Sequence, residues 1–571
     1  MMLKSKKRVW LFIFTILPLA TLLLLSFFTK DASGATQAQN GFTIRGTVFD
    51  HQGNPLDSVK VEIRAPQQDE PLAFVESHED GEWSLTFESV SSQTLVLKID
   101  RPHFLPLEIQ IDEVQVSKLR QTGILQMGEI QIERRITPAF WAATAIFILV
   151  LVLIAFEKLH STTAALAGLS AIFIVSFVGG AITPDLFIFD FEHAISFINW
   201  DVIFLVMAMM IIIAIIERTG IFQWMAFQAY RLSRGHSWLL VLILMLITAI
   251  ASALLDNFTT MLLMTPISLQ IGLALGINPL ALIIPEVLAS NVGGITTLIG
   301  TPTNILIGAY AGIGFSDFLA NQTVGVLIAL IGMGSFVLFF YRKEWRKRSG
   351  GISPKLYNVL KENAQIADPS SLWKAGLVFI LVLIGFIVGE KYHINVAVTA
   401  IVGATVLLIW LNPDIHAMII AVDWTTLVFF MALFIVVGAV QEVGLLAIIA
   451  SGMAKIIGEN LILGIFVIVF GVGTLSTTIA NIPLAASMLP IVRFLSTTIP
   501  GADNQALYYA LSMGAAMGGN GLLIGAEANL VTAGITQQAG SPISFKEFMK
   551  VGLPVTYITL VAGFLWLILR F

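Results

Sequence analysis

The sequence predicts a mostly helical membrane protein that carries a small β domain near its N-terminus. Of the 571 residues, 56% are hydrophobic and only 12% are charged, against roughly 25% charged residues in an average soluble domain. Soluble cores stop growing beyond about 300 residues, so lipid must cover much of this apolar surface. Alternating polar and apolar residues fill the stretch from Gly41 to Ile132, and long apolar runs begin near Thr137.

Composition also excludes several classes of function. Cysteine is absent, which excludes disulfides, thiolate metal sites and cysteine nucleophiles. The net charge of −5 is small for this length and argues against a nucleic-acid partner. The eight His residues show no HExxH spacing, and neither a Walker A loop nor a GxSxG elbow is found. We therefore expect no cofactor, no ATP-driven step and no enzymatic activity within this chain.

Residues 1–35 combine a basic start, KSKKR, with an apolar run from Val9 to Phe28. A run of about 20 residues is long enough to span the hydrocarbon as a helix. The small residues Ser33, Gly34 and Ala35 follow, so an uncleaved signal anchor and a cleaved signal peptide are both open. In either case the basic flank stays in the cytoplasm and the next segment is exported.

Residues 41–135 are expected to form an extracytoplasmic β-sandwich. Runs such as FTIRGTVFD, SVKVEIRA, DGEWSLTF and TLVLKID alternate in polarity, and Gly, Asn and Pro turns separate them at intervals of about 8–12 residues, as in antiparallel sandwiches. The pattern GTVFDHQGNPLDSVKVEI followed by DGEWSLTF resembles the carboxypeptidase-regulatory-like β-sandwich family. That resemblance implies binding or scaffolding rather than catalysis.

The rest of the chain is predicted to cross the membrane repeatedly. The expected spans are Thr137–Phe156, Thr162–Ile182, Val202–Ile216, Leu280–Ala311, Val324–Phe340, Ala375–Val388, Val396–Trp410, Thr425–Val440, Ala506–Thr532 and Val551–Leu569. Lys and Arg accumulate in cytoplasmic loops, and a cluster of five at residues 342–348 places the loop at 342–371 in the cytoplasm. Counting crossings outward from this loop places Lys158 inside and the β domain outside.

The chain also contains an internal repeat. At an offset of 224 residues, identical residues pair as Trp200 with Trp424, Met207 with Met431, Gly220 with Gly444, Asn257 with Asn481 and Pro266 with Pro490. At an offset of 225, Gly293, Gly294, Gly300 and Asn304 pair with Gly518, Gly519, Gly525 and Asn529. After the first membrane helices at 137–195, we place repeat 1 at 200–341 and repeat 2 at 372–571, with its core starting at 424. An odd number of crossings separates the copies, which predicts inverted topology, as in many secondary transporters.

Two interruptions by polar residues occur in each repeat. The first is LLDNFTT between Trp238 and Leu275, and its counterpart is STTIANIP between Leu461 and Phe494. Irregular backbone at membrane depth must be buried in protein or line a cavity, which predicts two re-entrant hairpins, one entering from each side. The second interruption is GTPTN within 280–311, and its counterpart is GAEAN within 506–532.

These interruptions supply candidate ion ligands. Hard cations prefer oxygen ligands, and the candidate side chains are Asn257, Thr259, Thr301, Thr303 and Asn304 in repeat 1 and Thr478, Asn481 and Asn529 in repeat 2. The four asparagines are the expected ligands of Na⁺. The half-helix N-termini beyond the breaks carry a partial positive charge that suits an anionic substrate. The alternative is that these residues only cap the broken helices.

Acidic residues at membrane depth are the other signal. Asp256 and Glu527 lie in the breaks, and Glu286 follows Pro285 near the start of a span. Ionisable residues at such positions are costly and are functional candidates by default. Burial favours the neutral form of a carboxyl group, which suits reversible proton binding. Glu286 has the simpler alternative of a solvated acid at the cytoplasmic interface.

The motifs LLDNFTTMLLMTPI, PEVLASNVGGITTLIGTPTNILIG and GGNGLLIGAEANLVTAGI resemble the arsenite-permease and pink-eyed-dilution branch of the ion-transporter superfamily, over residues 140–571. That superfamily also includes citrate transporters, divalent-anion/sodium symporters and sodium/proton antiporters. The resemblance implies an elevator-like movement of a hairpin-bearing domain against a scaffold, often in a homodimer. Two positions depart from the family pattern: Thr301 stands where Asp is common, and Glu527 stands where Ser is common.

We therefore expect an ion-coupled secondary active transporter of the plasma (inner) membrane that moves a small inorganic or organic ion. Na⁺/H⁺ exchange, which the acids favour, and Na⁺- or H⁺-coupled anion transport, which the helix N-termini favour, both stay open. The alternative is a membrane sensor that uses the β domain to bind a ligand. It is disfavoured because the longest internal loop, from Tyr341 to Lys374, is too short for an output domain. An intramembrane enzyme is disfavoured because no nucleophile–base or metal pattern is found.

Overall fold

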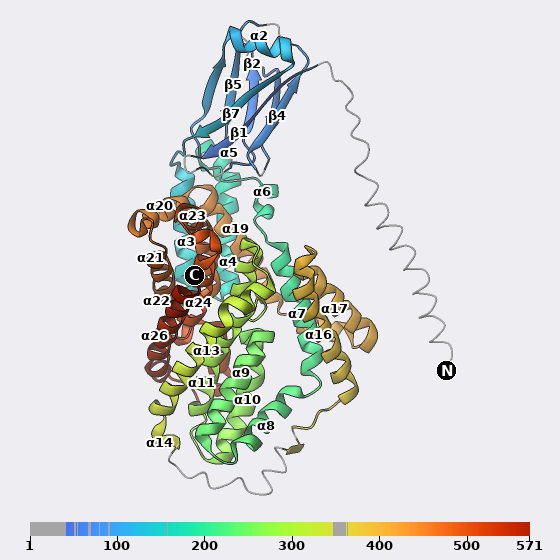
Figure 1. The fold of residues 1–571 in the computed structure, drawn as a ribbon, viewed down its shortest axis with the longest axis vertical. Helices are drawn as coiled ribbons and strands as arrows, with labels where there is room; N and C mark the ends of the chain where they lie inside the picture. The colour runs from blue at the N-terminus through green and yellow to red at the C-terminus, as the bar shows by residue number, and fades with distance from the viewer. Residues whose placement is uncertain are drawn as a thin grey trace, which may run out of the picture. The chain divides into compact units, whose positions relative to one another are not determined.

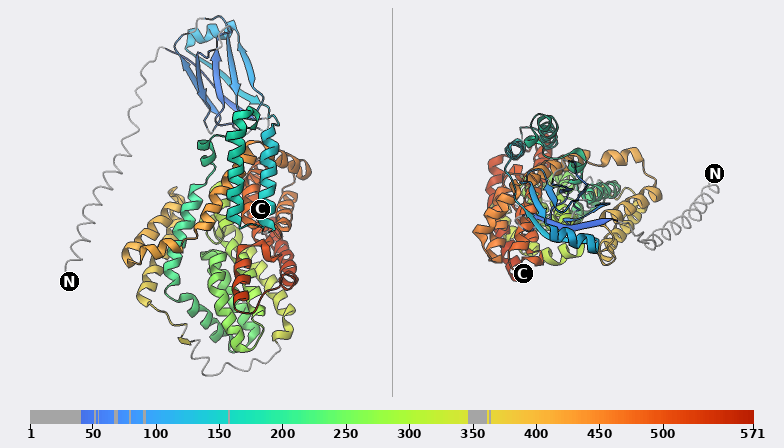
Figure 2. Two further views of the ribbon diagram at one scale, coloured as in Figure 1. Left: turned by 180° about the vertical axis from the view of Figure 1, so that it is seen from behind. Right: turned by 90° about the horizontal axis from the view of Figure 1, so that it is seen from above.

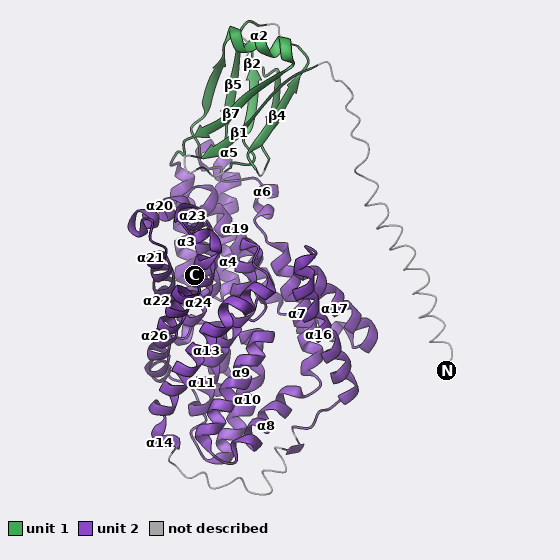
Figure 3. Cartoon of the chain, in the orientation of Figure 1, with its two compact units in different colours: residues 1–135 green, residues 136–571 purple. Residues whose placement is uncertain are grey.

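The computed structural model describes residues 41–345, except 51, 52, 54, 67–69, 79, 90, 91 and 157, and residues 361–571, except 363. The predicted signal segment at 1–35 and most of the predicted loop at 342–371 lie outside these described residues. The chain divides into two compact units, residues 1–135 and 136–571 (Figure 3).

Unit 1 contains two packed β-sheets. One has the strand order β4 (Glu82–Phe87), β1 (Phe42–Asp50), β7 (Ile124–Ile132), and the other has the order β3 (Ala73–Glu76), β2 (Lys60–Arg64), β5 (Leu95–Asp100), β6 (Leu107–Ile111). Alternate residues point into a shared core, as with Trp83 and Leu85 of β4 against Leu95 and Leu97 of β5. The expected β-sandwich is present, with one departure. Strand β1 pairs with β7 in parallel, because the chain passes through the second sheet and helix α2 (Glu113–Thr122) before it returns beside β1.

Unit 2 is helical and belongs to a membrane-spanning protein. Among the described residues, nine helices are long and apolar enough to cross a membrane. Its first helices are α3 (Pro138–Ala155), α4 (Ser161–Phe173) with its π-helical continuation to Gly179, and α6 (Phe191–Ser196). After the first series of helices come α16 (Pro369–Lys391), α17 (Val396–Leu411) and α18 (Ile415–Ala421). In Figures 1 and 2, α16 and α17 lie against α7 on one flank of this unit.

Two series of helices follow the same order. The first is α7 (Trp200–Glu217), α8 (Ile221–Ser233), α9 (Ser237–Leu254), α10 (Asn257–Leu275), α11 (Leu280–Gly293), α12 (Pro302–Ala311) and α13 (Phe315–Phe340). The second is α19 (Trp424–Glu442), α20 (Leu445–Ile457), α21 to α22 (Leu461–Leu475), α23 (Asn481–Thr498), α24 (Ala506–Gly518), α25 (Glu527–Gln538) and α26 (Phe545–Arg570). Their starting residues coincide at the offsets found in the sequence. Gly220 and Gly444, which precede α8 and α20, even share a positive φ, 81° and 92°.

The structure differs from the expected spans in three respects. The spans 280–311 and 506–532 are each split into two helices by an extended break. Helices α8 and α20 were not expected, because their apolar residues occupy only one face and form no continuous apolar run. Helices α13, α16 and α26 begin at Phe315, Pro369 and Phe545, several residues earlier than expected, because helical turns precede the apolar stretch in each. Helices α9 and α10 are each long enough to span by themselves, so re-entrant hairpins stay a prediction.

The breaks of the two series come together in the middle of unit 2. Helix α11 packs against α9, and α10 packs against α25 of the other series. Glycines allow the close approach: a Cβ on Gly293 would lie 2.5 Å from the backbone of Ala249, and a Cβ on Gly518 would lie 2.3 Å from the carbonyl oxygen of Gly473. Gly473 stands 224 residues after Ala249, so both series pack their broken helix on the first hairpin helix in the same way.

Candidate functional site

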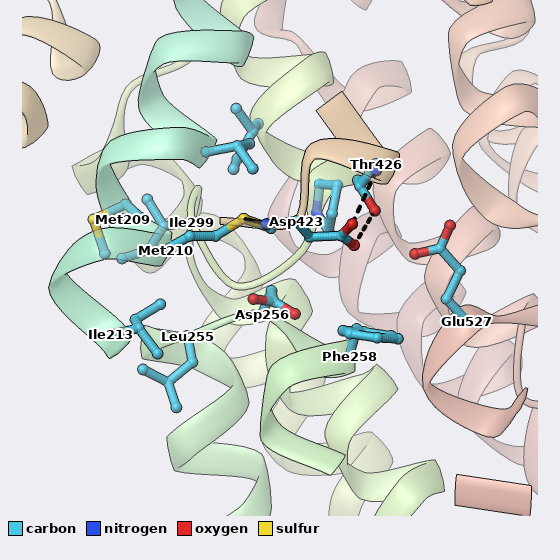
Figure 4. Close-up of a pocket in the computed structure, with 13 residues that line it drawn as sticks. Met209, Met210, Ile213, Leu255, Asp256, Phe258, Ile299, Asp423, Thr426 and Glu527 are labelled. Carbon is cyan, nitrogen blue, oxygen red and sulfur yellow. Dashed lines mark hydrogen bonds between the residues drawn. The ribbon is translucent and has the colours of Figure 1, made fainter. Parts of the chain in front are cut away.

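Three carboxylates line one small cavity among the breaks (Figure 4). They belong to Asp256, Asp423 and Glu527, and apolar side chains such as Met209, Ile299 and Ile305 form the remaining wall. The cavity has a volume of about 30 Å³, which admits one or two water-sized particles. In Figure 4 the carboxylates of Asp423 and Glu527 point toward one another. The cavity is therefore small, mostly apolar and acidic.

Asp256 is held by the start of α10. As the N-cap residue it accepts hydrogen bonds from the backbone N–H and the hydroxyl of Thr259, both at 2.7 Å. This is the usual pairing of an aspartate with the free amides of a helix N-terminus. Thr259, a predicted ligand, therefore positions Asp256.

Asp423 was not among the predicted site residues. It caps α19 by accepting hydrogen bonds from the backbone N–H groups of Thr425 and Thr426 and from the Thr426 hydroxyl. The sequence does hold a signal for it, because Asp423 directly precedes Trp424, the first residue of the repeat core. A capping acid before a span is common at membrane surfaces, and only the fold reveals that this one reaches the same cavity as Asp256.

Glu527 is the first residue of α25. No described Lys, Arg or His forms an ion pair with Glu527, Asp256 or Asp423 within 4.0 Å. Like charges around a small apolar cavity repel one another, and an entering cation or proton relieves this repulsion.

A larger cavity of about 720 Å³ adjoins the small one and shares Phe258, Asp423, Thr426 and Glu527 with it. Its lining also includes His160 and Ser161 at the start of α4.

A third cavity of about 220 Å³ is the counterpart of this large cavity under the repeat. The repeat offsets relate Thr425, Phe429 and Leu530 of the large cavity to Asp201, Leu205 and Ile305 of the third. Unit 2 thus contains two repeat-related cavities of unequal size, and each has lining residues in common with the small acidic cavity.

The two broken helices are held open by a pair of equivalent asparagines. The Asn304 amide donates to the carbonyl oxygens of Gly294, Ile295 and Thr297 at 3.4, 3.0 and 2.8 Å. The Asn529 amide donates to those of Gly519 and Leu522 at 2.8 and 3.1 Å. These asparagines satisfy carbonyls that the breaks leave without helical partners. Their own Oδ1 atoms accept hydrogen bonds from Ser512 and Asn291.

The remaining predicted ligands occupy varied positions. Asn257 is buried at the tip between α9 and α10 and donates to Asn291. Its counterpart Asn481 is also buried, and no described residue hydrogen-bonds its side chain. Thr301 caps α12 and Thr303 is fully buried behind it, with no partner for its hydroxyl among the described residues. Thr478 is exposed and donates to the Leu475 carbonyl oxygen, so the structure does not bring it to the acidic cavity.

Comparison with known proteins gives the following matches. The citrate transporter family model matches residues 151–514. An uncharacterized transporter of Mycobacterium tuberculosis is 35% identical over 435 residues, covering 75% of this chain and 98% of the relative. The P protein of Homo sapiens is 30% identical over 562 residues, covering 85% of this chain and 65% of the relative. The crystal structure of the Alcanivorax borkumensis YdaH transporter superposes with a TM-score of 0.48 and 14% identity, covering 76% of this chain and 97% of that chain.

Proposed function

Because the chain belongs to the citrate transporter family of membrane transporters, we propose that it exchanges Na⁺ for H⁺, with Asp256, Asp423 and Glu527 as the exchanging acids. One observation carries this proposal: three carboxylates line a cavity of about 30 Å³ without a described basic partner. A carboxylate in such a place is stabilised either by a proton or by a metal cation. Competition between the two for the same oxygens is the simplest basis for exchange.

Cation exchange fits this cavity better than citrate does. Three acids repel a tricarboxylate, and no described basic side chain forms an ion pair with them. A dehydrated monovalent cation matches the cavity in size and charge. For Na⁺ we propose the Oδ1 atoms of Asn257 and Asn481 as additional ligands, since those of Asn304 and Asn529 already accept hydrogen bonds.

Alternating access follows from the unequal cavities in this proposal. Exchange of shapes between the two helical series would enlarge the 220 Å³ cavity and shrink the 720 Å³ cavity, as in transporters with inverted repeats. The Lys/Arg bias places Lys158 in the cytoplasm, and the large cavity begins nearby at His160. We therefore assign this conformation to the inward-open state of an elevator-like cycle.

The second candidate is transport of a small anion coupled to Na⁺ or H⁺. Its supporting observation is that Pro302 and Glu527, the first residues of α12 and α25, both line the small cavity. Two helix N-termini thus meet there, and such ends attract anions. The acids at the same place weigh against this candidate.

The test uses purified protein in liposomes that carry a proton gradient and a pH-sensitive dye. We expect added Na⁺ to collapse the gradient without any organic anion present, and Asp256→Asn to slow the collapse at least tenfold. Glu286→Gln is the matched control, because it removes a fully buried carboxyl that lies outside the cavity. A gradient that survives Na⁺, Li⁺ and K⁺ would refute exchange, and carboxylates and oxyanions would then be tested for coupled uptake.

Location and assembly are further parts of the proposal. We place unit 1 outside the plasma (inner) membrane, as the charge bias of the loops requires. Protease added to intact spheroplasts should then cleave this unit and spare the loop around residues 346–360. We also propose the homodimer that the family resemblance implies, and light scattering of the detergent-purified protein gives its mass.

A further inference from the structure

A buried chain of asparagine side chains connects the two helical series. Asn257 Nδ2 donates to Asn291 Oδ1 at 2.8 Å. Asn291 Nδ2 donates to the Oδ1 atoms of Asn520 and Asn529 at 2.9 and 3.0 Å. The four side chains are between 0% and 6% exposed. Asn291 lies in α11 of the first series, and both of its acceptors lie in the second.

The direction of every amide in this chain is fixed from its far end. Both N–H groups of Asn529 bond backbone carbonyls, and the Nδ2 of Asn520 bonds the carbonyl of Leu288. Both residues must therefore present Oδ1 to Asn291. Asn291 answers with its two N–H groups, so its own Oδ1 faces Asn257. A carboxamide has one oxygen and one nitrogen end, and each residue leaves the next a single satisfied orientation.

The last member of the chain is Asn257. Because its Nδ2 is committed to Asn291, its Oδ1 is held on the opposite side, where it accepts only the N–H of Phe258 at 3.1 Å. A carbonyl oxygen has two lone pairs, so Oδ1 keeps one for a cation. The neighbouring residue, Asp256, lines the small acidic cavity.

The second series lacks this arrangement. The residue equivalent to Asn291 is Ala516, 225 positions later, and Asn481 has no described hydrogen-bond partner for its side chain. The two hairpin tips therefore differ: the tip at Asn257 is fixed by hydrogen bonds that begin in the other half of the protein, and the tip at Asn481 is not.

We propose that Asn291 is a positioning residue that holds Asn257 with its oxygen toward the cation and links that site to α25, which carries Glu527. The inference rests on the proposed exchange function and adds to it that the two hairpin sites are unequal. Cation affinity at Asn257 then depends on Asn291, although Asn291 does not touch the cation.

The test compares Asn291→Ala with Ser176→Ala in liposomes. Ser176 is a matched control, because it is also fully buried and takes part in three hydrogen bonds, far from the cavities. We expect Asn291→Ala to raise the half-saturating Na⁺ concentration about tenfold, the factor that loss of one buried hydrogen bond corresponds to, with the maximal rate per folded protein less affected. Ser176→Ala should leave half-saturation at the wild-type value.

A double variant separates positioning from general damage. If Asn291 acts through Asn257, Asn291→Ala adds less than a twofold rise in half-saturating Na⁺ when Asn257 is already Ala. Additive effects, or an unchanged half-saturation in the single variant, would overturn the inference. If Asn291→Ala does not fold, Asn291→Ser carries the same expectation, because its hydroxyl is too short to hold Asn257.

Thermal unfolding with and without Na⁺ distinguishes failure of this inference from failure of the exchange function. Na⁺ that binds the folded state raises its melting temperature, whether or not exchange occurs. A wild-type protein that Na⁺ stabilises but that does not exchange, together with a loss of stabilisation in Asn291→Ala, would refute exchange and support the inference. A wild-type protein that Na⁺ does not stabilise would overturn the inference.

Discussion

Gly300 gives the sharpest prediction about the broken helices. A Cβ at this position would lie 2.3 Å from the carbonyl oxygen of Gly294 and 2.8 Å from that of Ser252. Both atoms belong to the backbone, so neither can rotate away. The equivalent Gly525 is slightly less confined: its Cβ would lie 2.6 Å from the Gly519 oxygen and 3.0 Å from the Ser476 oxygen.

Substitution of these glycines by alanine should therefore give a graded series. Overpacking costs about 1–3 kcal/mol, and we expect Gly300→Ala at or above the upper end and Gly525→Ala below it. Gly376 in α16 is the control, because a Cβ there meets no atom within 4 Å. Alanine at this helical position should instead stabilise by about 0.5–1 kcal/mol.

The assay is thermal unfolding of the three detergent-purified variants, followed by size-exclusion chromatography, with Na⁺-driven proton flux as the second readout. The expected order of melting temperatures is Gly376→Ala, wild type, Gly525→Ala and Gly300→Ala, from highest to lowest. A Gly300→Ala variant that melts with the wild type would refute the close approach of the break to α9.

Three further predictions concern single side chains. Asp423→Asn should lower Na⁺-driven proton flux at least tenfold while the protein still folds, because asparagine also caps helices; wild-type flux would remove Asp423 from the site. Asn304→Ala and Asn529→Ala should each lower the free energy of unfolding by about 1–3 kcal/mol, the cost of leaving buried carbonyls unpaired, and thermal unfolding measures whether the two costs match. In unit 1, the bond from Lys60 at 2.6 Å, and then that from Arg64, hold the pKa of Glu62 below its ordinary value of 4.5. The folded carboxylate is thus favoured, so its contribution to stability is present above pH 4.5 and is lost as the pH falls below it. Acid unfolding of Glu62→Gln, followed by hydrogen exchange in β2, should lack that loss, and an identical acid profile would contradict the assignment.

Much of the fold was predictable because polar residues are rare in apolar sequence. The pairs Trp200 with Trp424 and Asn304 with Asn529 reveal the repeat, since a chance match of such residues at one offset is improbable in a membrane protein. Capping residues and prolines likewise predict where the helices break. The breaks, their counterparts and the overall helical class therefore follow from the residues themselves.

The site was less predictable because it depends on contacts between distant segments. Asp423 precedes a span and is indistinguishable from an ordinary capping acid until the fold places it opposite Glu527. Asn291 and Asn520 lie in apolar stretches without a break, and their partners are more than 200 residues away. Periodicity and spacing report the local environment, and they do not report which helices meet across the repeat.

The unequal cavities have a consequence for how this sequence tolerates change. If the two halves exchange shapes during transport, each half must be stable in both, and every residue that lines a cavity is judged twice. Phe429, now beside the large cavity, would have to fit the crowded place that Leu205 fills today. A substitution chosen to make the present conformation more rigid would then slow turnover without damaging the fold. Mutational surveys by stability alone would score such changes as harmless, and surveys by growth would not.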